Sequence, residues 1–424
     1  MGKASQNFST GMIELSDKLW NSNFIKIFII AILCNLSQQM IGSTLPYYVI
    51  VLGGSPSQAG VMTGLLTVAA LVSRPFIGII ADTKGRKIVT IVGIFIFTMG
   101  TIVYMFSTNV MAIMVFRVIQ GVGLACVSTA NGTIAADVLP QKRLAEGTAY
   151  FGLSTTAATS FGPALALSLV TSGSYTPMFG TSALAMVIAL VVISSLRYEK
   201  QARLQREEYL RLNPEEAQKE REAAEKKKAA AKSEKLIWRI FEKSVFRPSL
   251  VVIVITISMS CVLSFLPSYA ISKGIMNTGI FFTAAAIVIL VVRITTSKLF
   301  NIVPTLALVI PSIAVFGMAM FSISFLSGFV HLLVSAALYG LGIGAALPTM
   351  AALVIKSAPV DKRGSANATY FCAFDIGMGV GSALWGFVID YMGGYSVAFT
   401  GAGICCMIAI VMSIFLLRNM SLKA

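Results

Sequence analysis

The sequence has 424 residues, of which 56% are hydrophobic and 12% are charged, and its mean hydropathy is +0.82. Soluble globular domains carry about 25% charged residues, so this composition excludes an ordinary soluble enzyme. The net charge of +15 would suit a nucleic-acid-binding protein, but the basic residues gather in connections between apolar segments and in one central segment.

Twelve apolar segments are long enough to cross a bilayer as helices, because the hydrocarbon core is about 30 Å thick and a helix rises about 1.5 Å per residue. Alternation of apolar and polar residues is weak, which argues against a membrane β-barrel. We therefore predict an all-α membrane protein with twelve transmembrane helices. The predicted spans are 24–51, 57–80, 88–106, 110–136, 145–170, 177–196, 248–270, 277–297, 302–326, 330–355, 364–388 and 394–417.

The connections between the spans differ in charge. With the amino terminus inside, the basic connections around Lys84, Lys142 and Lys362 face the cytoplasm, and the outward connections carry little more than Lys273. Because Lys and Arg are enriched in cytoplasmic loops, we expect a multi-pass protein of the cell membrane with both termini in the cytoplasm. The same pattern predicts contact with lipid headgroups and no nucleic-acid partner.

A charged segment divides the spans into two groups of six. We expect it to form a cytoplasmic helix, because Asn213 suits an N-cap and Pro214 the first helical position. The predicted parts are a cytoplasmic lead-in (1–22), a six-helix bundle (23–196), a charged linker (197–244), a second six-helix bundle (245–417) and a cytoplasmic tail (418–424).

The two groups of spans repeat one another. LPQKRLAEGTAYF at 139–151 matches APVDKRGSANATYF at 358–371, and Arg74 in VSRPF matches Arg293 in VVRIT, each at an offset of about 220 residues. Six-plus-six parallel repeats joined by a long cytoplasmic connection are typical of one large class of secondary transporters. The repeat therefore predicts two pseudo-symmetric bundles.

The connection after the second span, GIIADTKGRKIV at 78–89, concentrates charge between apolar runs. Its first glycine is expected to allow close helix approach and its second a turn with positive φ. Its acid is expected to cap the start of the eleventh span, and its arginine to pair with the acid that ends the fourth span. We predict that this latch holds the halves together in one state. Its residues are Gly78, Asp82, Gly85, Arg86, Lys87 and Asp137.

This connection resembles the signature G-x-x-x-D-x-x-G-R-[RK] of the major facilitator superfamily, and the resemblance covers the chain outside the linker. FRVIQGVG in the fourth span resembles the R-x-x-Q-G-x-G element of that family, which implies that Arg117 and Gln120 influence a nearby acid's protonation. Snorkelling of Arg117 to the outer headgroups is the alternative. Gly162-Pro163, a predicted helix bend, partly matches G-x-x-x-G-P-x-x-G-G of the drug:proton antiporter branch.

Asp375 is the acid that lies near the middle of a predicted span. A carboxyl group in a low-dielectric interior can take up and release a proton as its surroundings change. We predict that Asp375 carries the coupling proton or binds a cationic group of the substrate; a structural, hydrogen-bonded acid is the alternative. Other polar residues at similar depth are expected to line a central cavity: Asn35, Gln38, Gln39, Ser128, Asn131, Tyr150, Thr155, Ser260, Ser264 and Tyr370.

These features favour a proton-coupled exporter of small amphipathic molecules, of the multidrug efflux kind, working by alternating access. An importer or exchanger of organic anions, with Arg74, Arg117 and Arg293 as countercharges, stays open, as does a non-transporting receptor or scaffold. We find no catalytic constellation and no metal-ligand spacing, so we expect no enzymatic activity and no cofactor apart from a proton gradient as energy source. The expected partners are a small-molecule substrate, protons and lipids, and the chain is expected to be a monomer.

Overall fold

The computed structural model describes residues 19–140, 143–170, 174–196, 198–199, 211–212, 242–275, 278–299, 303–359 and 363–421. Twelve long α-helices lie in this part, and each coincides with one predicted span. Ten of them are long and apolar enough to cross a membrane, and α12 adds the shorter apolar stretch Gly279–Arg293. The helices are α2 (Ser22–Val51), α3 (Pro56–Lys84), α4 (Arg86–Phe106), α5 (Val110–Val138), α6 (Leu144–Leu169), α7 (Thr176–Ser194), α11 (Phe246–Ser272), α12 (Gly279–Leu299), α13 (Thr305–Ser324), α14 (Phe329–Ser357), α15 (Arg363–Tyr391) and α16 (Tyr395–Ser421), with a 3₁₀ turn, η2 (Lys243–Val245), before α11.

Short polar side chains fix where several helices begin. The Asn21 side chain accepts a hydrogen bond from the Phe24 amide at 2.8 Å, and Asn109 caps α5 in the same way. Ser55 and Gln58 form a reciprocal capping box at the start of α3. The first amides of a helix have no intrahelical partner and lipid offers none, so these caps define the starts of α2, α3 and α5.

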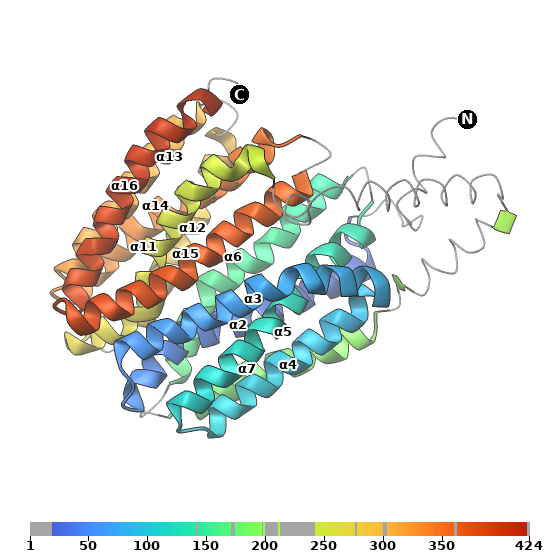
Figure 1. The fold of residues 1–424 in the computed structure, drawn as a ribbon, viewed down its shortest axis with the longest axis horizontal. Helices are drawn as coiled ribbons and strands as arrows, with labels where there is room; N and C mark the ends of the chain where they lie inside the picture. Colours follow the sequence, from blue (N-terminus) through green and yellow to red (C-terminus); the bar gives the residue numbers. More distant parts are fainter. Residues whose placement is uncertain are drawn as a thin grey trace.

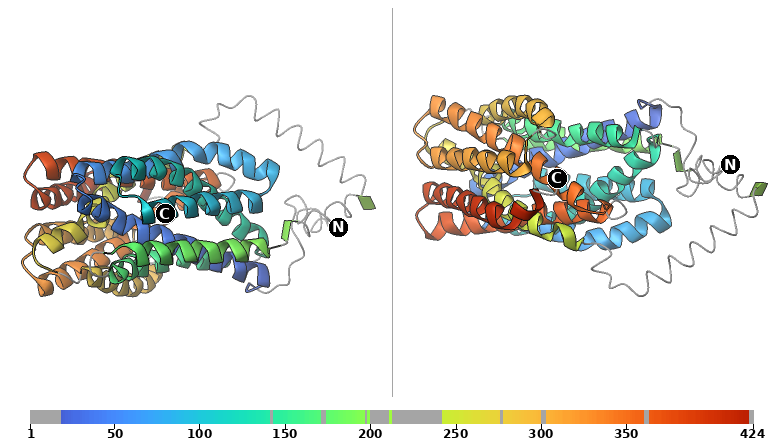
Figure 2. Two further views of the ribbon diagram at one scale, coloured as in Figure 1. Left: turned by 90° about the horizontal axis from the view of Figure 1, so that it is seen from below. Right: turned by 90° about the horizontal axis from the view of Figure 1, so that it is seen from above.

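The helices form two bundles with the same internal contacts. In the first, α2 packs against α6 and α7, α5 against α3 and α4, and α4 against α7. The second repeats the pattern, since α11 packs against α15 and α16, α14 against α12 and α13, and α13 against α16. Figures 1 and 2 show the blue-to-green helices grouped together and the yellow-to-red helices grouped together. The predicted pseudo-symmetric arrangement is confirmed; we call the groups the N bundle (α2–α7) and the C bundle (α11–α16).

The start of α2 lies beside the ends of α5 and α7. The Asn21 side-chain amide donates to the Val138 carbonyl at 2.8 Å, and the Lys26 ammonium donates to the Ser195 carbonyl at 3.4 Å. The chain leaves the N bundle after α7, so we call this the linker end. The opposite end, where α3 begins and α15 ends, is called the far end.

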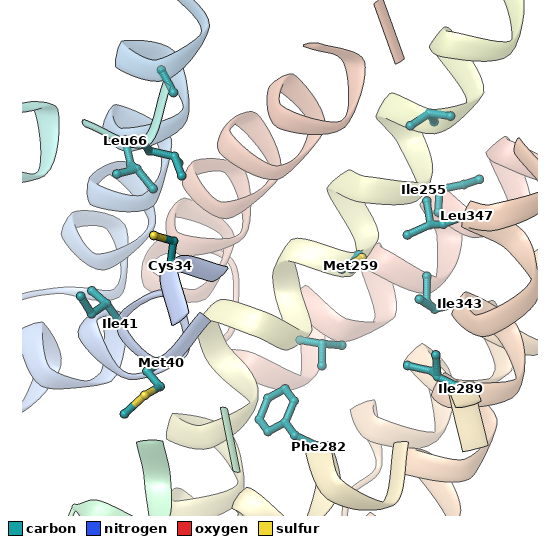
Figure 3. Packing of buried hydrophobic residues seen from close by; sticks show 14 of the residues in the cluster. Cys34, Met40, Ile41, Leu66, Ile255, Met259, Phe282, Ile289, Ile343 and Leu347 are labelled. Carbon is teal, nitrogen blue, oxygen red and sulfur yellow. The ribbon is translucent and has the colours of Figure 1, made fainter. Parts of the chain in front are cut away.

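Apolar side chains fill the interior of each bundle. Figure 3 shows Cys34, Met40 and Ile41 of α2 with Leu66 of α3 on one side, and residues of the C bundle on the other. All are at most 9% exposed. Between bundles the most extensive contacts are those of α3 with α15, α6 with α12 and α2 with α11. The labelled residues of the C bundle are Ile255, Met259, Phe282, Ile289, Ile343 and Leu347.

Candidate functional site

The bundles approach most closely where α3 meets α15, toward the far end. A Cβ atom on Gly60 would collide with the Ser382 carbonyl oxygen, and a Cβ on Gly64 would lie 3.1 Å from the Gly379 carbonyl oxygen. Side chains larger than hydrogen at these positions would force the helices apart, because here the neighbouring atoms are backbone. We call this contact, formed by Gly60, Gly64, Gly379 and Ser382, the glycine seam.

An acid of the C bundle closes the seam at the far end. The Ser57 amide, in the first turn of α3, donates a hydrogen bond of 2.8 Å to the Asp390 Oδ2 atom near the end of α15. A carboxylate at a helix N-terminus is favoured both by the free amides and by the helix dipole. Asp390 therefore caps a helix of the other bundle, a role that the sequence analysis did not identify.

Deeper between the same two helices lies an ion pair. The Nη1 atom of Arg74 is 2.5 Å from the Oδ2 atom of Asp375, and the two side chains are 21% and 17% exposed. Asp375 lies twelve residues after the start of α15 and Arg74 ten residues before the end of α3, so both are about 15–18 Å from the linker end. The predicted proton-carrying residue thus sits between the bundles, with its countercharge on the other bundle.

Arg74 is the partner that the sequence analysis missed, since it was considered only as a countercharge for an anionic substrate. The available signal was an intramembrane base and an intramembrane acid at matching depth. Such charges are costly in a membrane unless they pair or face an aqueous space.

Arg117 and Gln120 are not part of this pair, although the sequence grouped them with Asp375. Arg117 is 2% exposed, so it is packed inside the N bundle and does not extend to the surface. Its Nη1 atom donates to Gln120 Oε1 at 2.7 Å, and the Tyr104 hydroxyl donates to the same oxygen at 3.2 Å. The Gln120 amide nitrogen lies 3.3 Å from both the Phe97 carbonyl and the Thr101 hydroxyl. This network joins α4 to α5.

Replacing Gln120 with Leu is expected to lower the unfolding temperature of the purified protein by several degrees. The change leaves the guanidinium of Arg117 and the hydroxyl of Tyr104 without their shared acceptor, and each unsatisfied buried group costs about 1–3 kcal/mol. Thermal unfolding in detergent measures the effect. Gln38→Leu on α2 is the matched control, and equal unfolding temperatures for the two variants would contradict the importance of the network.

Within the predicted latch, the pairing of Arg86 with Asp137 is confirmed, but this pair does not join the two halves. Arg86 Nη1 forms an ion pair with Asp137 Oδ2. These residues belong to α4 and α5, which lie in the same bundle, so the pair does not hold the two halves together. Both residues fall within the predicted first bundle (23–196), so the sequence already placed this pair inside one half of the molecule.

The two glycines of the latch behave differently. Gly85 has φ of 99°, as predicted for the turn between α3 and α4. A Cβ on Gly78 would meet none of the described atoms within 4 Å, so the predicted close approach at this glycine is wrong for the part of the chain that the structure describes. The predicted contact of Asp82 with the start of α15 lies outside the described residues, as does the Asp82 side chain.

Glu199, which follows α7, completes the turn around Gly85. Its Oε1 atom accepts hydrogen bonds from the Arg86 and Lys87 amides at 2.7 and 2.9 Å, and so caps α4. The Lys87 ammonium donates to the Leu196 carbonyl at 2.6 Å. Burial raises the pKa of Tyr198, and the neighbouring Glu199 raises it further, so its hydroxyl stays protonated and donates to Glu199 at 3.2 Å. The sequence analysis missed this role; the signal was an acid directly after the sixth span.

Replacing Gly85 with Ala is expected to destabilise the protein by about 1–3 kcal/mol, because residues with a Cβ rarely adopt positive φ. The added Cβ would also lie 3.0 Å from the Glu199 carboxylate. Thermal unfolding of the purified variant checks the expectation. Gly180→Ala in α7, where a Cβ meets no atom within 4 Å, should leave stability unchanged or raise it.

The predicted cavity-lining residues fall into two groups. Asn35, Gln38 and Gln39 on α2 are partly exposed, and Asn35 donates to Thr155 on α6 at 3.3 Å. Ser128, Tyr150 and Thr155 are exposed, and the Tyr150 ring lies tilted against that of Trp20, with the ring centroids 5.4 Å apart. These positions remain predictions, since exposure alone does not distinguish an aqueous cavity from the lipid-facing surface.

The other group is buried between helices, so the prediction that these residues line a cavity is wrong for the described state. Asn131 contacts Thr90 of α4 at 3.3 Å, and the Tyr370 hydroxyl donates to the Leu347 carbonyl at 3.3 Å. Polar residues commonly join helices within membranes, and the sequence did not separate the two uses. The buried side chains, each at most 6% exposed, are Asn131, Ser260, Ser264 and Tyr370, and Ser264 bonds Ser382 at 2.8 Å.

Gly162 and Pro163 lie inside α6, as predicted. A Cβ on Gly162 would lie 2.8 Å from the Cβ of Gln39, so this glycine sets the close approach of α6 to α2. Toward the far end of α6, a Cβ on Gly279 of α12 would lie 3.3 Å from the Cβ of Leu167. The second interface between bundles therefore also relies on a glycine.

Comparison with known proteins gives the family. The sequence matches the model of the Major Facilitator Superfamily over residues 27–332 and 307–423. The staphylopine export protein of Staphylococcus aureus is 24% identical over 384 residues, which are 87% of this chain and 90% of that protein. The quinolone resistance protein NorA of S. aureus is 24% identical over 152 residues, 35% of this chain and 39% of that protein.

A solved structure shows the same fold. The inward open conformation of the xylose transporter XylE from E. coli has a TM-score of 0.70 to this chain and 14% sequence identity. The match covers 93% of this chain and 95% of that chain. At this identity the likeness establishes the arrangement of the helices and nothing about the substrate.

Proposed function

The chain belongs to the major facilitator superfamily, a family of membrane transporters and not of enzymes, and from that premise we propose a proton-coupled exporter of small amphipathic molecules. The observation that carries this proposal is the ion pair between Arg74 and Asp375, which joins the two bundles inside the membrane. The names of the relatives support export: one is a staphylopine exporter and another confers quinolone resistance.

The ion pair supplies a physical route to coupling. An ionised Asp375 is attracted to the guanidinium of Arg74, while a protonated Asp375 loses most of that attraction. A proton and a cationic group of the substrate then compete for one carboxyl group, which is what antiport requires. The bundles rock about this site, so that Asp375 is presented to one side of the membrane and then to the other.

The protein is proposed to lie in the plasma or inner membrane of the cell, with its linker end in the cytoplasm. Lys84, Arg86 and Lys87 lie at that end, as cytoplasmic basic residues do. The glycine seam and Asp390 join the bundles at the far end, so the described state is the one closed to the outside. In this state the transporter would collect its substrate from the cytoplasm.

Proton movement tests the proposal directly. Wild-type protein is reconstituted into liposomes that contain the pH-sensitive dye pyranine, and aromatic amines, carboxylates and amino acids are added outside. We expect at least one compound to enter the liposomes while protons leave them. The rate of this exchange should rise when the liposome interior is made more acidic than the outside. Proton and compound moving in the same direction would instead support the importer of anions, and transport without any pH dependence would refute coupling.

A further inference from the structure

The two charges between the bundles limit which substrates can enter the site at Asp375. Arg74 comes from α3 of the N bundle and Asp375 from α15 of the C bundle, and both are partly exposed. A substrate that reaches the pair must therefore meet an acid and a base together. Removing one partner from an ion pair in a low-dielectric site is costly, because the remaining charge has lost its compensation.

Three classes of substrate differ in this respect. A cation bound to Asp375 leaves the guanidinium of Arg74 without a counterion, and an anion bound to Arg74 leaves the carboxylate of Asp375 without one. A zwitterion pairs with both, since its carboxylate contacts Arg74 while its ammonium contacts Asp375. Guanidinium binds carboxylate with two parallel hydrogen bonds, so the first contact is directional as well as strong.

Neighbouring charges in the described interior do not change this balance. Arg117 is enclosed in the N bundle with Gln120 and Tyr104, and Arg293 interacts electrostatically with Tyr370. The ion pair of Arg86 with Asp137 lies at the linker end, inside the N bundle. Among the described residues, the ion pair of Asp375 is the one with Arg74.

We propose that the substrates are zwitterions, in which an apolar body carries a carboxylate and an ammonium close together. The two charged groups insert between Arg74 and Asp375. This inference rests on the proposed transport function and specifies its substrate class. The proton that enters in exchange takes the place of the substrate ammonium at Asp375, and the substrate carboxylate leaves Arg74 with the rest of the molecule.

Two matched sets of compounds test the inference on the full-length protein in lipid nanodiscs at neutral pH. The first set is homophenylalanine, 3-phenylpropylamine and 4-phenylbutyrate; the second is tryptophan, tryptamine and indole-3-propionate. Within each set, the amine lacks only the carboxylate and the acid lacks only the ammonium. Titration calorimetry gives the dissociation constants. In at least one set we expect the zwitterion to bind about tenfold more tightly than both analogues.

Two double variants assign the preference to the pair. In Arg74→Gln/Asp375→Asn both charges are removed together, so no unpaired charge remains and the zwitterion should lose its advantage. Arg86→Gln/Asp137→Asn makes the same change at the other ion pair. In this variant, the ratio between the dissociation constants of the analogues and that of the zwitterion should stay as in the wild type. The inference would be overturned if the zwitterion were the tightest-binding compound in neither set, or if no compound bound at all. It would also be overturned if the preference for the zwitterion survived in Arg74→Gln/Asp375→Asn.

The outcomes separate this inference from the proposed function. Proton-coupled export of amines without a zwitterion preference would overturn the substrate class and leave the exporter intact. A zwitterion preference that depends on Arg74 and Asp375, found together with pH-independent transport, would refute proton coupling and leave the substrate class intact.

Discussion

Asp375→Asn is expected to abolish transport driven by a pH gradient, with a fall of about tenfold or more in the initial rate. The amide cannot carry a proton, and it leaves the guanidinium of Arg74 without its counterion. Breaking a buried pair by removing one partner costs about 3–5 kcal/mol, and each 1.4 kcal/mol corresponds to about a factor of ten in a population. Pyranine-loaded proteoliposomes report the proton flux.

A variant that simply unfolds would show the same loss, so thermal unfolding and gel filtration accompany the transport measurement. Glu242→Gln is the matched control, because it removes a carboxylate outside the spans and keeps an acceptor for the Ser244 amide, which now lies 3.0 Å from the Glu242 carboxylate. The control should transport at the wild-type rate. Gradient-driven transport that persists in folded Asp375→Asn would exclude this residue as the coupling site.

Gly60→Val is expected to hold the far end open and to reduce transport by about tenfold or more. The new side chain would meet the Ser382 carbonyl of the other bundle, and overpacking of this kind costs about 1–3 kcal/mol. This cost raises the free energy only of the state in which the far end is closed, so the population shifts toward the open state. A cysteine at position 57, which is 9% exposed in the wild type, reports the opening through faster reaction with a membrane-impermeant maleimide.

The control for this variant is Gly180→Val in α7, where an added Cβ would meet none of the described atoms within 4 Å. It should keep both the transport rate and slow labelling at position 57. If Gly60→Val labels as slowly as the wild type, the glycine seam does not govern closure of the far end.

The helices were predictable because their signal is local. Each span needs about 20 apolar residues in a row, and no tertiary contact can override that requirement in lipid. The repeat was equally accessible, since matching residues such as Arg74 and Arg293 recur at a fixed offset. Both results depend on the order of residues along the chain and not on which helix faces which.

The site depended on contacts between helices and was therefore predicted only in part. Asp375 was identified from its depth in a span, but its pairing with Arg74 required knowing that α3 and α15 lie side by side. Arg86 and Asp137 were paired correctly, and both fall in the predicted first bundle, so the pair could not hold the two halves together. Polar residues such as Ser264 and Asn131 looked suited to a cavity because packing and solvation use the same side chains.

The glycine seam also bears on how fast the bundles can exchange. Where α3 meets α15, backbone faces backbone, so few rotamers have to change when the surfaces part. Interdigitated side chains would have to disengage one by one and would make the landscape rugged, whereas smooth surfaces separate with little friction. The activation barrier would then be concentrated in a handful of polar contacts, the Ser57–Asp390 bond among them.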